Sequence, residues 1–182
     1  ENDATVLVCT PTYALHLAAV AAAYKLDLPQ THVHTTIHAG EPGAGLPATR
    51  QRLQDAWGAR CFDHAGATEV GAWGFECQER SGLHFNEAEF ICEVVDPASD
   101  AAADEGELIV TNLGRSGMPV IRYRTGDRVR LQDQPCACGR TYQRLDGGVI
   151  GRSDDAFIVR GVIFYPSTIE NIVRQFPQVT EF

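Results

Sequence analysis

Lysine is almost absent from this sequence of 182 residues: of the fifteen basic residues only Lys25 is a lysine, and the other fourteen are arginines. The formal net charge of -9 argues against a nucleic-acid surface, which normally carries a basic patch. An anionic ligand would therefore have to be met by local hydrogen-bond donors or by a metal ion. We expect no nucleic-acid partner.

Long hydrophobic runs are lacking as well. The longest, from Ala14 to Tyr24, is rich in alanine, contains His16 and is too short to span a bilayer. The chain does not open with the basic segment and cleavage pattern of a secretory signal. We therefore expect a cytoplasmic protein with no membrane partner.

The six cysteines do not form an obvious disulfide framework. Cys9, Cys61 and Cys92 lie in apolar, strand-like runs, where cysteine behaves as a small buried hydrophobic residue. A cytoplasmic protein in which only some cysteines bind metal fits this distribution better than a disulfide scaffold.

The first third of the chain predicts alternating strands and helices. The run ATVLVCT predicts a strand buried on both faces, and Thr10-Pro11 predicts the N-cap and first turn of a helix to about Tyr24. The second strand is TTIHAG, and a helix over PATRQRLQDAW stops at Gly58, before a third strand, RCFDHAG. This order implies a parallel sheet, whose ligand sites lie beyond the carboxyl ends of the strands.

From Trp73 the pattern changes to short β-type runs separated by Gly, Pro, Asn and Asp. These runs are WGFEC, LHFN, FICEVVD, GELIVTNL, PVIRYRTGD and RVRLQD. They predict an antiparallel, barrel-like part. The expected fold class is therefore mixed α/β and α+β, with a parallel β-α-β part followed by the antiparallel part.

Another change follows LDGGVIGRSDD. The run FIVRGVIF is strand-like, and PSTIENIVRQF predicts a helix in which Ser167 and Glu170 are spaced as a capping box. Its apolar stripe consists of Ile169, Ile172, Val173 and Phe176. These elements predict one further β-α unit at the end of the chain.

Three short motifs carry candidate chemistry. In AGATEVG, Thr68 and Glu69 follow a strand, and a carboxylate beside a hydroxyl suits a Mg²⁺-phosphate site. In YRTGDRV, Gly126 permits a tight turn that would present Asp127 at a strand end, where its carboxylate can bind both ribose hydroxyls. The third, GRSDD…VRG, is a glycine-flanked connector with an arginine and two acids. Taken alone, each is better explained as a solvated turn, a hairpin or a linker.

The order and spacing of GEPG, GATE, YRTGD and GRSDDAFIVRGVIFYPSTIE resemble the acyl-adenylate-forming enzyme superfamily. The phrases MPVIRYRTGD, PCACGRT and VRG…FYPSTIE resemble in particular its phenylacetate-CoA ligase branch. The resemblance covers essentially the entire chain. It implies an enzyme, an AMP-forming acid-CoA ligase. Such a ligase joins an aromatic carboxylic acid to ATP, giving an acyl-AMP and pyrophosphate, and passes the acyl group to CoA.

The resemblance also implies residue roles. Thr68 would contact phosphate, Glu69 would hold Mg²⁺, and Asp154 would be the hinge of a swinging small domain. The nucleotide would be bound by Gly40, Glu41, Pro42, Asp63, His64, Asp127 and Arg152. The acid would be bound near Tyr13, His16, Gly66 and Ala67.

The domains implied by the resemblance divide at residue 150. Residues 1–150 would be the later part of a large N-terminal AMP-binding domain, α/β over 1–66 and β-rich over 67–150. Residues 151–182 would hold the hinge and the start of the small C-terminal domain.

Three features depart from the family pattern. The aromatic residue that usually covers the adenine is Ala65 here, and His64 is the candidate substitute. The phosphate loop expected upstream of GEPG and the catalytic lysine expected downstream of Glu170 are both absent, and Lys25 cannot replace that lysine. We therefore expect the chain to be a central piece of a longer enzyme, with little or no adenylation activity alone.

The motif PCACGR holds Cys136 and Cys138, which can be read together with Cys77 and His84 of FECQERSGLH. Three thiolates and an imidazole form a tetrahedral set typical of structural zinc, with no open catalytic position. A disulfide between Cys136 and Cys138 would close a very small, strained ring in a reducing compartment. Four unlinked residues, with His84 as an ordinary core histidine, remain the alternative. Zinc would fasten the WGFEC loop to the CACGR hairpin.

Two other functions stay open at this stage. The enzyme could load a carrier-protein thiol or adenylylate a cofactor in place of making an acyl-CoA. A non-catalytic, zinc-stabilised nucleotide-binding module is the third interpretation. The oligomeric states left open include a homodimer.

Overall fold

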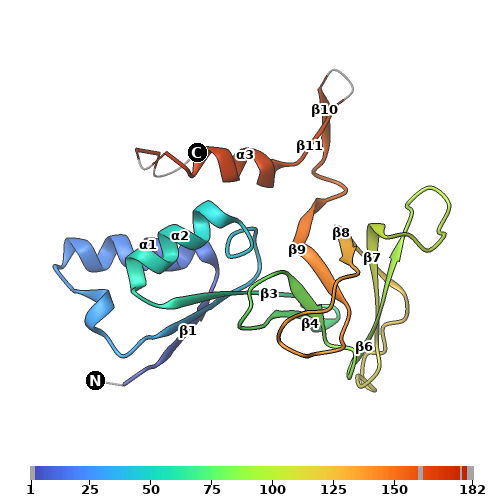
Figure 1. The fold of residues 1–182 in the computed structure, drawn as a ribbon, viewed down its shortest axis with the longest axis horizontal. Coiled ribbons are helices and arrows are strands. Elements are labelled where there is room, and N and C mark those ends of the chain that lie inside the picture. The colour runs from blue at the N-terminus through green and yellow to red at the C-terminus, as the bar shows by residue number, and fades with distance from the viewer. Residues whose placement is uncertain (1–2, 160–161, 177, 180–182) are drawn as a thin grey trace. The chain divides into compact units, whose positions relative to one another are not determined.

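The computed structural model describes residues 3–159, 162–176, 178 and 179 (Figure 1). The chain forms two compact units, one of Glu1–His64 with Glu170–Phe182 and the other of Ala65–Ile169. None of the helices in the described part of the chain is long and apolar enough to cross a membrane.

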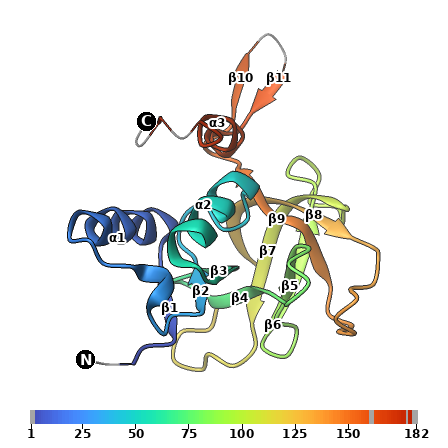
Figure 2. The same cartoon turned by 60° about the vertical axis from the view of Figure 1, so that its left-hand side comes forward.

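The first unit contains a parallel sheet in the spatial order β1-β2-β3. Its strands are β1 (Val6–Cys9), β2 (Thr35–His38) and β3 (Arg60–Ala67). They alternate with α1 (Pro11–Ala23), the short 3-10 helix η1 (Leu28–Gln30) and α2 (Pro47–Trp57). Both α-helices lie on the same side of these strands (Figure 2). The predicted β-α-β-α-β order and the parallel sheet are confirmed.

Local signals set the ends of the two helices. The Thr10 side chain accepts a hydrogen bond from the Tyr13 N–H at 3.4 Å, and Pro11 occupies the first helical position. Helix α2 ends at Gly58, which adopts the left-handed conformation with φ of 62°. The indole N–H of the buried Trp57 donates to the Ala14 carbonyl at 3.1 Å and so joins the two helices.

Strand β1 differs from the prediction that both of its faces are buried. Val6 and Val8 are 44% and 70% exposed, while Leu7 and Cys9 pack on the core of the first unit. Within the described residues β1 pairs only with β2, so it is an edge strand. A continuous apolar run therefore marks a strand here without burying both of its faces.

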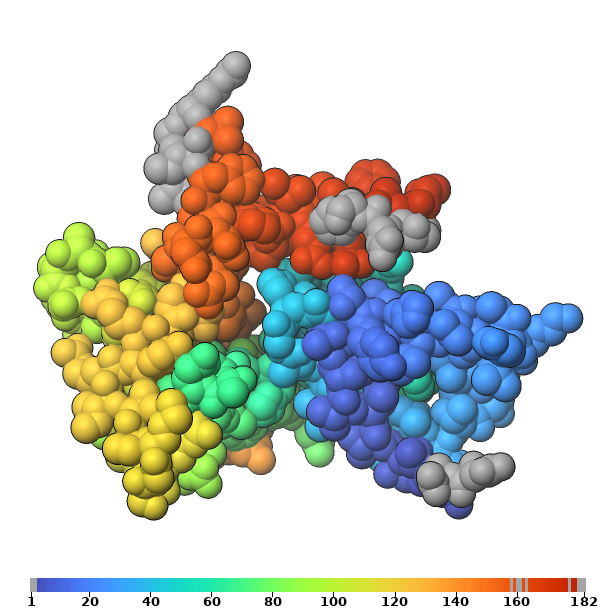
Figure 3. All heavy atoms as spheres, turned by 180° about the vertical axis from the view of Figure 1, so that it is seen from behind, coloured from blue at the N-terminus to red at the C-terminus, as the bar shows by residue number. Residues whose placement is uncertain are grey.

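The second unit contains the predicted antiparallel sheet, in the spatial order β4-β5-β9-β8-β7-β6. Its strands are β4 (Gly71–Glu76), β5 (Leu83–Phe85), β6 (Phe90–Val95), β7 (Glu105–Asn112), β8 (Tyr123–Gln132) and β9 (Arg144–Arg152). In the space-filling view the side chains of these strands, green to orange, form one continuous mass (Figure 3).

The core of the second unit is apolar and is drawn from all six of these strands. Trp73 and Phe85 lie at its centre with ring centroids 5.9 Å apart. The other buried members are Val70, Leu83, Phe90, Val94, Leu108, Val110, Val129 and Leu145. Residues two apart, such as Leu83 and Phe85 on β5 or Leu108 and Val110 on β7, supply this core, as the pleat of a strand requires.

Strand β8 corrects the predicted turn at Gly126. The predicted runs PVIRYRTGD and RVRLQD form a single strand over Tyr123–Gln132. On β7, Glu107 and Ile109 pair with Arg128 and Arg124, so Thr125–Asp127 form a bulge opposite Leu108 alone. Gly126 has φ of 75°, which a bulge tolerates best with glycine.

The end of the chain also differs from its prediction. Part of the expected connector, through Arg152, belongs to β9. The run FIVRGVIF is not one strand: β10 (Phe157–Val159) and β11 (Val162–Phe164) pair antiparallel, and the two residues between them lie outside the described part.

The capping box predicted for the last helix is wrong. Helix α3 (Pro166–Val173) begins before Ser167, whose hydroxyl donates to the Ile150 carbonyl at 2.8 Å. Glu170 instead accepts a bond from Arg174 Nε at 2.7 Å, one turn further along. A tertiary hydrogen bond therefore replaces the local one.

Leu108→Ala tests the core of the second unit. Leu108 is fully buried, so we expect the substitution to lower the free energy of unfolding by about 2–5 kcal/mol. Leu113→Ala, at a side chain that is 56% exposed, is the matched control and should change it by less than about 0.5 kcal/mol. Urea unfolding followed by far-UV circular dichroism measures both, and equal midpoints would contradict the assigned core.

Candidate metal centre and nucleotide site

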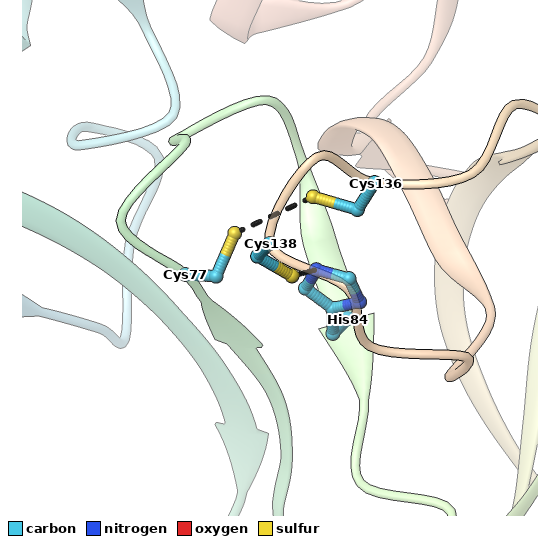
Figure 4. A group of neighbouring side chains, drawn as sticks. All are labelled: Cys77, His84, Cys136 and Cys138. Atoms are coloured by element: carbon cyan, nitrogen blue, oxygen red, sulfur yellow. Dashed lines mark hydrogen bonds between the residues drawn. The ribbon is translucent and has the colours of Figure 1, made fainter.

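Two loops of the second unit bring the predicted metal ligands together (Figure 4). Cys77 directly follows β4, and His84 lies on β5. Cys136 and Cys138 lie between β8 and β9, in a turn closed by the Gly139 N–H, which donates to the Cys136 carbonyl at 3.0 Å. All four residues predicted from PCACGR and FECQERSGLH therefore share one site.

The distances within this cluster match a tetrahedral metal site. Cys77 Sγ lies 3.6 Å from Cys136 Sγ, and Cys138 Sγ lies 3.5 Å from His84 Nε2. All four ligand atoms lie within 4.8 Å of one another. A tetrahedron with zinc–sulfur bonds of about 2.3 Å and zinc–nitrogen bonds of about 2.0 Å has edges of about 3.8 Å (S–S) and about 3.5 Å (S–N). The donor set and its spacing therefore fit zinc.

The pKa shifts of two of the four residues, His84 and Cys138, favour the protonation state that metal binding needs. His84 Nδ1 lies 3.4 Å from the Tyr142 carbonyl, which leaves Nε2 free to face Cys138. Burial lowers the pKa of His84 and keeps its imidazole neutral, as coordination requires. Hydrogen bonds from the backbone and side chain of Arg140 lower the pKa of Cys138 to about 7, whereas burial raises the pKa of Cys77.

Arg144 joins the two loops that carry the cluster. This buried side chain donates through Nη1 to the Ser81 carbonyl at 3.1 Å and to the Ser81 hydroxyl, and through Nη2 to the Gln134 carbonyl at 3.0 Å. Three thiolates around Zn²⁺ would carry one net negative charge, which this guanidinium would partly offset. Sequence reasoning missed Arg144, because nothing in a strand sequence distinguishes a buried arginine from an exposed one.

A second polar site lies at the β8 bulge. The Asp127 N–H donates to Thr125 Oγ1 at 3.0 Å, and that hydroxyl donates to the Leu108 carbonyl at 3.0 Å. The Gly126 N–H donates to Glu107 Oε1 at 3.3 Å. Asp127 is therefore presented by a hydrogen-bonded bulge within β8, and not by the predicted strand end.

Glu107 of β7 is the buried acid that supports this bulge. Its carboxylate also accepts bonds from Arg124 Nε at 3.0 Å and Nη2 at 2.5 Å. Sequence reasoning missed this residue. The available signal was a glutamate inside the apolar run GELIVTNL, where an acid needs a partner.

Arg152 and Asp154 complete the bulge site. Arg152 donates through Nε and Nη2 to both oxygens of Asp154 at 2.9 Å, and through Nη1 to the Thr125 carbonyl at 3.2 Å. Its Nη1 also lies 3.6 Å from Asp127 Oδ1. Burial raises the pKa of Asp127 while Arg152 opposes that rise, and the bond to Arg152 lowers the pKa of Asp154. The structure thus brings three predicted residues together.

Thr68 and Glu69 lie in the turn between β3 and β4, with both side chains exposed. The turn is closed by the Val70 N–H, which donates to the Ala67 carbonyl at 3.2 Å. Gly66 precedes this turn on β3, and a Cβ there would lie 2.9 Å from the Gly71 carbonyl oxygen. The glycine is therefore needed for close approach of the two strands.

Two other predicted residues lie earlier on β3. Asp63 and His64 are half-buried, and burial lowers the pKa of His64. Ala65, where the sequence departs from the motif that it resembles, packs against the core of the second unit with Ala67. That His64 stacks on the adenine in place of the usual aromatic residue stays a prediction.

The GEPG loop, which carries the predicted residues Gly40, Glu41 and Pro42, contacts the start of α1. Glu41 Oε1 accepts bonds from the Thr12 N–H at 2.7 Å and from Thr12 Oγ1 at 2.5 Å, which caps the N-terminus of α1. A Cβ on Gly40 would lie 3.5 Å from Thr10 Cγ2, so the GEPG loop lies against Thr10. Pro42 follows in the same loop and is exposed. The Glu41 side chain therefore has a structural contact of its own.

Tyr13 and His16 lie on α1 with exposed side chains and ring centroids 6.2 Å apart. They are the acid-binding candidates in the first unit. The predicted acid- and nucleotide-binding residues thus fall in two groups, one in each unit.

Comparison with known sequences gives relatives with a single name. The chain is 34% identical over 180 residues to a phenylacetate-coenzyme A ligase of Thermus thermophilus, and 31% identical over 182 residues to one of Pseudomonas putida. These alignments cover 96% and 97% of this chain and 40% of each relative. The chain therefore spans 40% of the length of the curated relatives it matches. No protein-family model matches it.

Solved structures give the same picture. A 2-hydroxyisobutyryl-CoA ligase in the postadenylation state, in complex with 2-HIB-AMP, superposes with a TM-score of 0.91 at 32% identity. The match covers 96% of this chain and 38% of that one. An anthranilate CoA ligase in complex with anthranoyl-AMP shares the fold, with a TM-score of 0.70 at 20% identity over 98% of this chain and 35% of that one.

Glu107→Gln tests the support of the bulge. The amide cannot pair with Arg124 as a carboxylate does, so we expect a loss of about 1–3 kcal/mol in the free energy of unfolding. Hydrogen exchange at the amides of 125–127 should accelerate. Glu93→Gln, which removes the more exposed pair with Arg122, is the control and should cost less than about 1 kcal/mol. Unchanged exchange in Glu107→Gln would show that the bulge holds without it.

Proposed function

We propose, from the homology of this chain to part of the phenylacetate-coenzyme A ligases, that it carries part of the adenylation site of an AMP-forming acid-CoA ligase. In the first half-reaction the carboxylate oxygen of the acid attacks the α-phosphorus of ATP, giving acyl-AMP and releasing pyrophosphate. In the second, the thiol of CoA attacks the acyl carbon and AMP leaves. The alignments with ligases of that name support both steps.

The observation that carries this proposal is the group of Asp127, Arg152 and Asp154 on the supported bulge. A half-buried carboxylate can accept hydrogen bonds from both hydroxyls of a ribose. Arg152 places a fixed positive charge 3.6 Å from it, where it can meet the ribose or the phosphate of a nucleotide. Asp154 follows at the end of β9, where we propose the hinge of the small domain.

Thr68 and Glu69 are the proposed residues on the phosphate side. Mg²⁺, when bound with ATP, offsets the negative charge that develops at phosphorus. One carboxylate together with phosphate oxygens is a usual ligand set for this ion, so the exposed Glu69 fits that role. The Thr68 hydroxyl can donate to a phosphate oxygen.

The acid that we propose is aromatic, because the curated relatives are named for phenylacetate. The structural neighbour at 32% identity instead contains the adenylate of 2-hydroxyisobutyrate, a small aliphatic acid. A test panel must therefore contain both kinds. Pyrophosphate release without formation of an acyl-CoA would favour transfer to a carrier thiol or to another acceptor.

We propose further that the 182 residues alone do not catalyse adenylation. The chain spans 40% of the length of its relatives, and its one lysine, Lys25, follows α1 and the turn at Tyr24, far in sequence from the proposed hinge. Pyrophosphate release by this chain alone, at the rate of a full-length protein that contains it, would overturn this proposal.

We propose that Cys77, His84, Cys136 and Cys138 bind one structural zinc ion. The two ligand distances of 3.6 and 3.5 Å support this, since they are close to the edges of a zinc tetrahedron. Four protein ligands leave no position for substrate, so the ion would hold the loops together. All six cysteines are free of disulfides, which suits the reducing cytoplasm that we propose as the location.

Metal analysis tests the zinc proposal. We expect about one equivalent of zinc in protein prepared without chelator, and less than about half in Cys136→Ser or Cys138→Ser. Cys92→Ser removes a thiol on β6, outside the cluster, and should leave the zinc content unchanged. Chelation should lower the melting temperature of the parent and of Cys92→Ser alike. A metal-free parent protein of unchanged stability would count against the site.

Asp127→Asn tests the nucleotide site in a full-length protein that contains the chain. Losing charge-assisted bonds to two ribose hydroxyls should raise the KM for ATP about 10-fold or more, with little change in the KM for the acid. Acid-dependent pyrophosphate release measures both constants. The matched control is Asp133→Asn, at an exposed acid one residue beyond β8. An unchanged KM for ATP in Asp127→Asn would remove Asp127 from the ribose site.

A further inference from the structure

The turn that carries Thr68 and Glu69 is held through its backbone by the loop between β7 and β8. Arg115 Nη1 donates to the Glu69 carbonyl at 2.7 Å and to the Thr68 carbonyl at 3.3 Å. Asn112 Nδ2 donates to the next carbonyl, that of Val70, at 2.9 Å. Two side chains thus bind three successive carbonyls, and we propose that Asn112 and Arg115 are positioning residues for the magnesium-phosphate site.

Asn112 also holds the conformation of the loop between β7 and β8, on which Arg115 lies. Its Oδ1 accepts bonds from the Gly114 N–H at 3.0 Å and the Arg115 N–H at 2.8 Å, which forms an Asx-type turn. The Asn112 N–H donates to the Val120 carbonyl at 3.0 Å and closes the other side of the loop. One amide side chain therefore fixes the loop with its oxygen and the Thr68-Glu69 turn with its nitrogen.

This arrangement leaves the reactive groups of the turn available. The hydrogen bonds from Arg115 and Asn112 to this described turn go to its carbonyl oxygens, while the side chains of Thr68 and Glu69 remain exposed. A magnesium ion requires near-ideal octahedral geometry, so a site whose carboxylate ligand is mobile binds the ion less tightly. Restraining the backbone at both residues fixes where the carboxylate and the hydroxyl can point.

The inference rests on the proposed function, since it assigns Glu69 to Mg²⁺ and Thr68 to phosphate. A loop that served only the stability of the hairpin would have a different signature. Loss of such a loop would lower the melting temperature and weaken the binding of all substrates alike. A positioning role would instead appear in the dependence on Mg²⁺ and ATP, with the other substrates unaffected.

Hydrogen exchange on the 182-residue chain tests the contact itself. Arg115→Ala should accelerate exchange of the Val70 amide, which closes the turn onto the Ala67 carbonyl, by about tenfold, equivalent to about 1.4 kcal/mol. The matched control is Arg122→Ala. Arg122 is an exposed arginine at the other end of the same loop and pairs with Glu93, so its replacement should leave the exchange rate of the Val70 amide unchanged. Equal exchange in the parent and Arg115→Ala would overturn the proposal.

Kinetics in a full-length protein that contains the chain test the role. For Arg115→Ala we expect about a tenfold rise in the Mg²⁺ concentration that half-saturates pyrophosphate release, with unchanged KM for the acid and for CoA. Arg115→Lys keeps a donor that reaches the carbonyls and should recover most of the loss, whereas Arg122→Ala should match the parent.

The outcomes separate the two proposals. A parent enzyme that releases no pyrophosphate with any acid of the panel would overturn the proposed function, and with it the magnesium role of this loop. An active Arg115→Ala enzyme with faster exchange at Val70 but unchanged Mg²⁺ dependence would overturn the positioning role alone. A uniform loss of activity with a lower melting temperature would likewise assign Arg115 to stability only.

Discussion

The pairing of the buried Glu107 carboxylate with Arg124 and the Gly126 N–H is the interaction on which the β8 bulge depends. An acid in an apolar strand is costly unless it is paired, and here Arg124 and the Gly126 N–H satisfy it. The same bonds hold the β8 bulge open, and the bulge places Asp127 beside Arg152. The pairing of a buried acid thus sets the geometry of the proposed nucleotide site.

The hairpin of β8 and β9 carries different chemistry at its two ends. Its loop holds Cys136 and Cys138, while its far end holds Asp127 opposite Arg152 in the ladder. The ends of paired strands open more readily than their centres, because the hydrogen bonds at the ends are exposed to water. A metal ion bound at the loop would keep the strands paired at that end. The ion pair between Arg152 and Asp154 lies beside the other end of the hairpin. The zinc proposal and the nucleotide proposal therefore concern one ladder.

The sequence predicted those features that depend on residues close together in the chain, such as the ends of the helices. The cap at Thr10 and the stop at Gly58 set α1 and α2, and the residue types at Cys77, His84, Cys136 and Cys138 predicted a set that the fold brings together. The errors arose where a distant partner decides the outcome. Ser167 bonds Ile150 and does not cap its helix, and Gly126 forms a bulge because β7 lies beside it. The roles of Arg115 and Arg144 were unpredictable for the same reason, since their partners are distant in sequence.

The two tryptophans have a consequence for spectroscopy. Trp57 donates to Ala14 within the first unit, and Trp73 lies in the core of the second. Both indoles are buried, at 6% and 1% exposure, so each will shift its emission when its own surroundings open. Replacing one at a time with phenylalanine gives the chain a separate optical reporter for each unit. The cooperativity between the units can then be read from whether the two emission curves coincide.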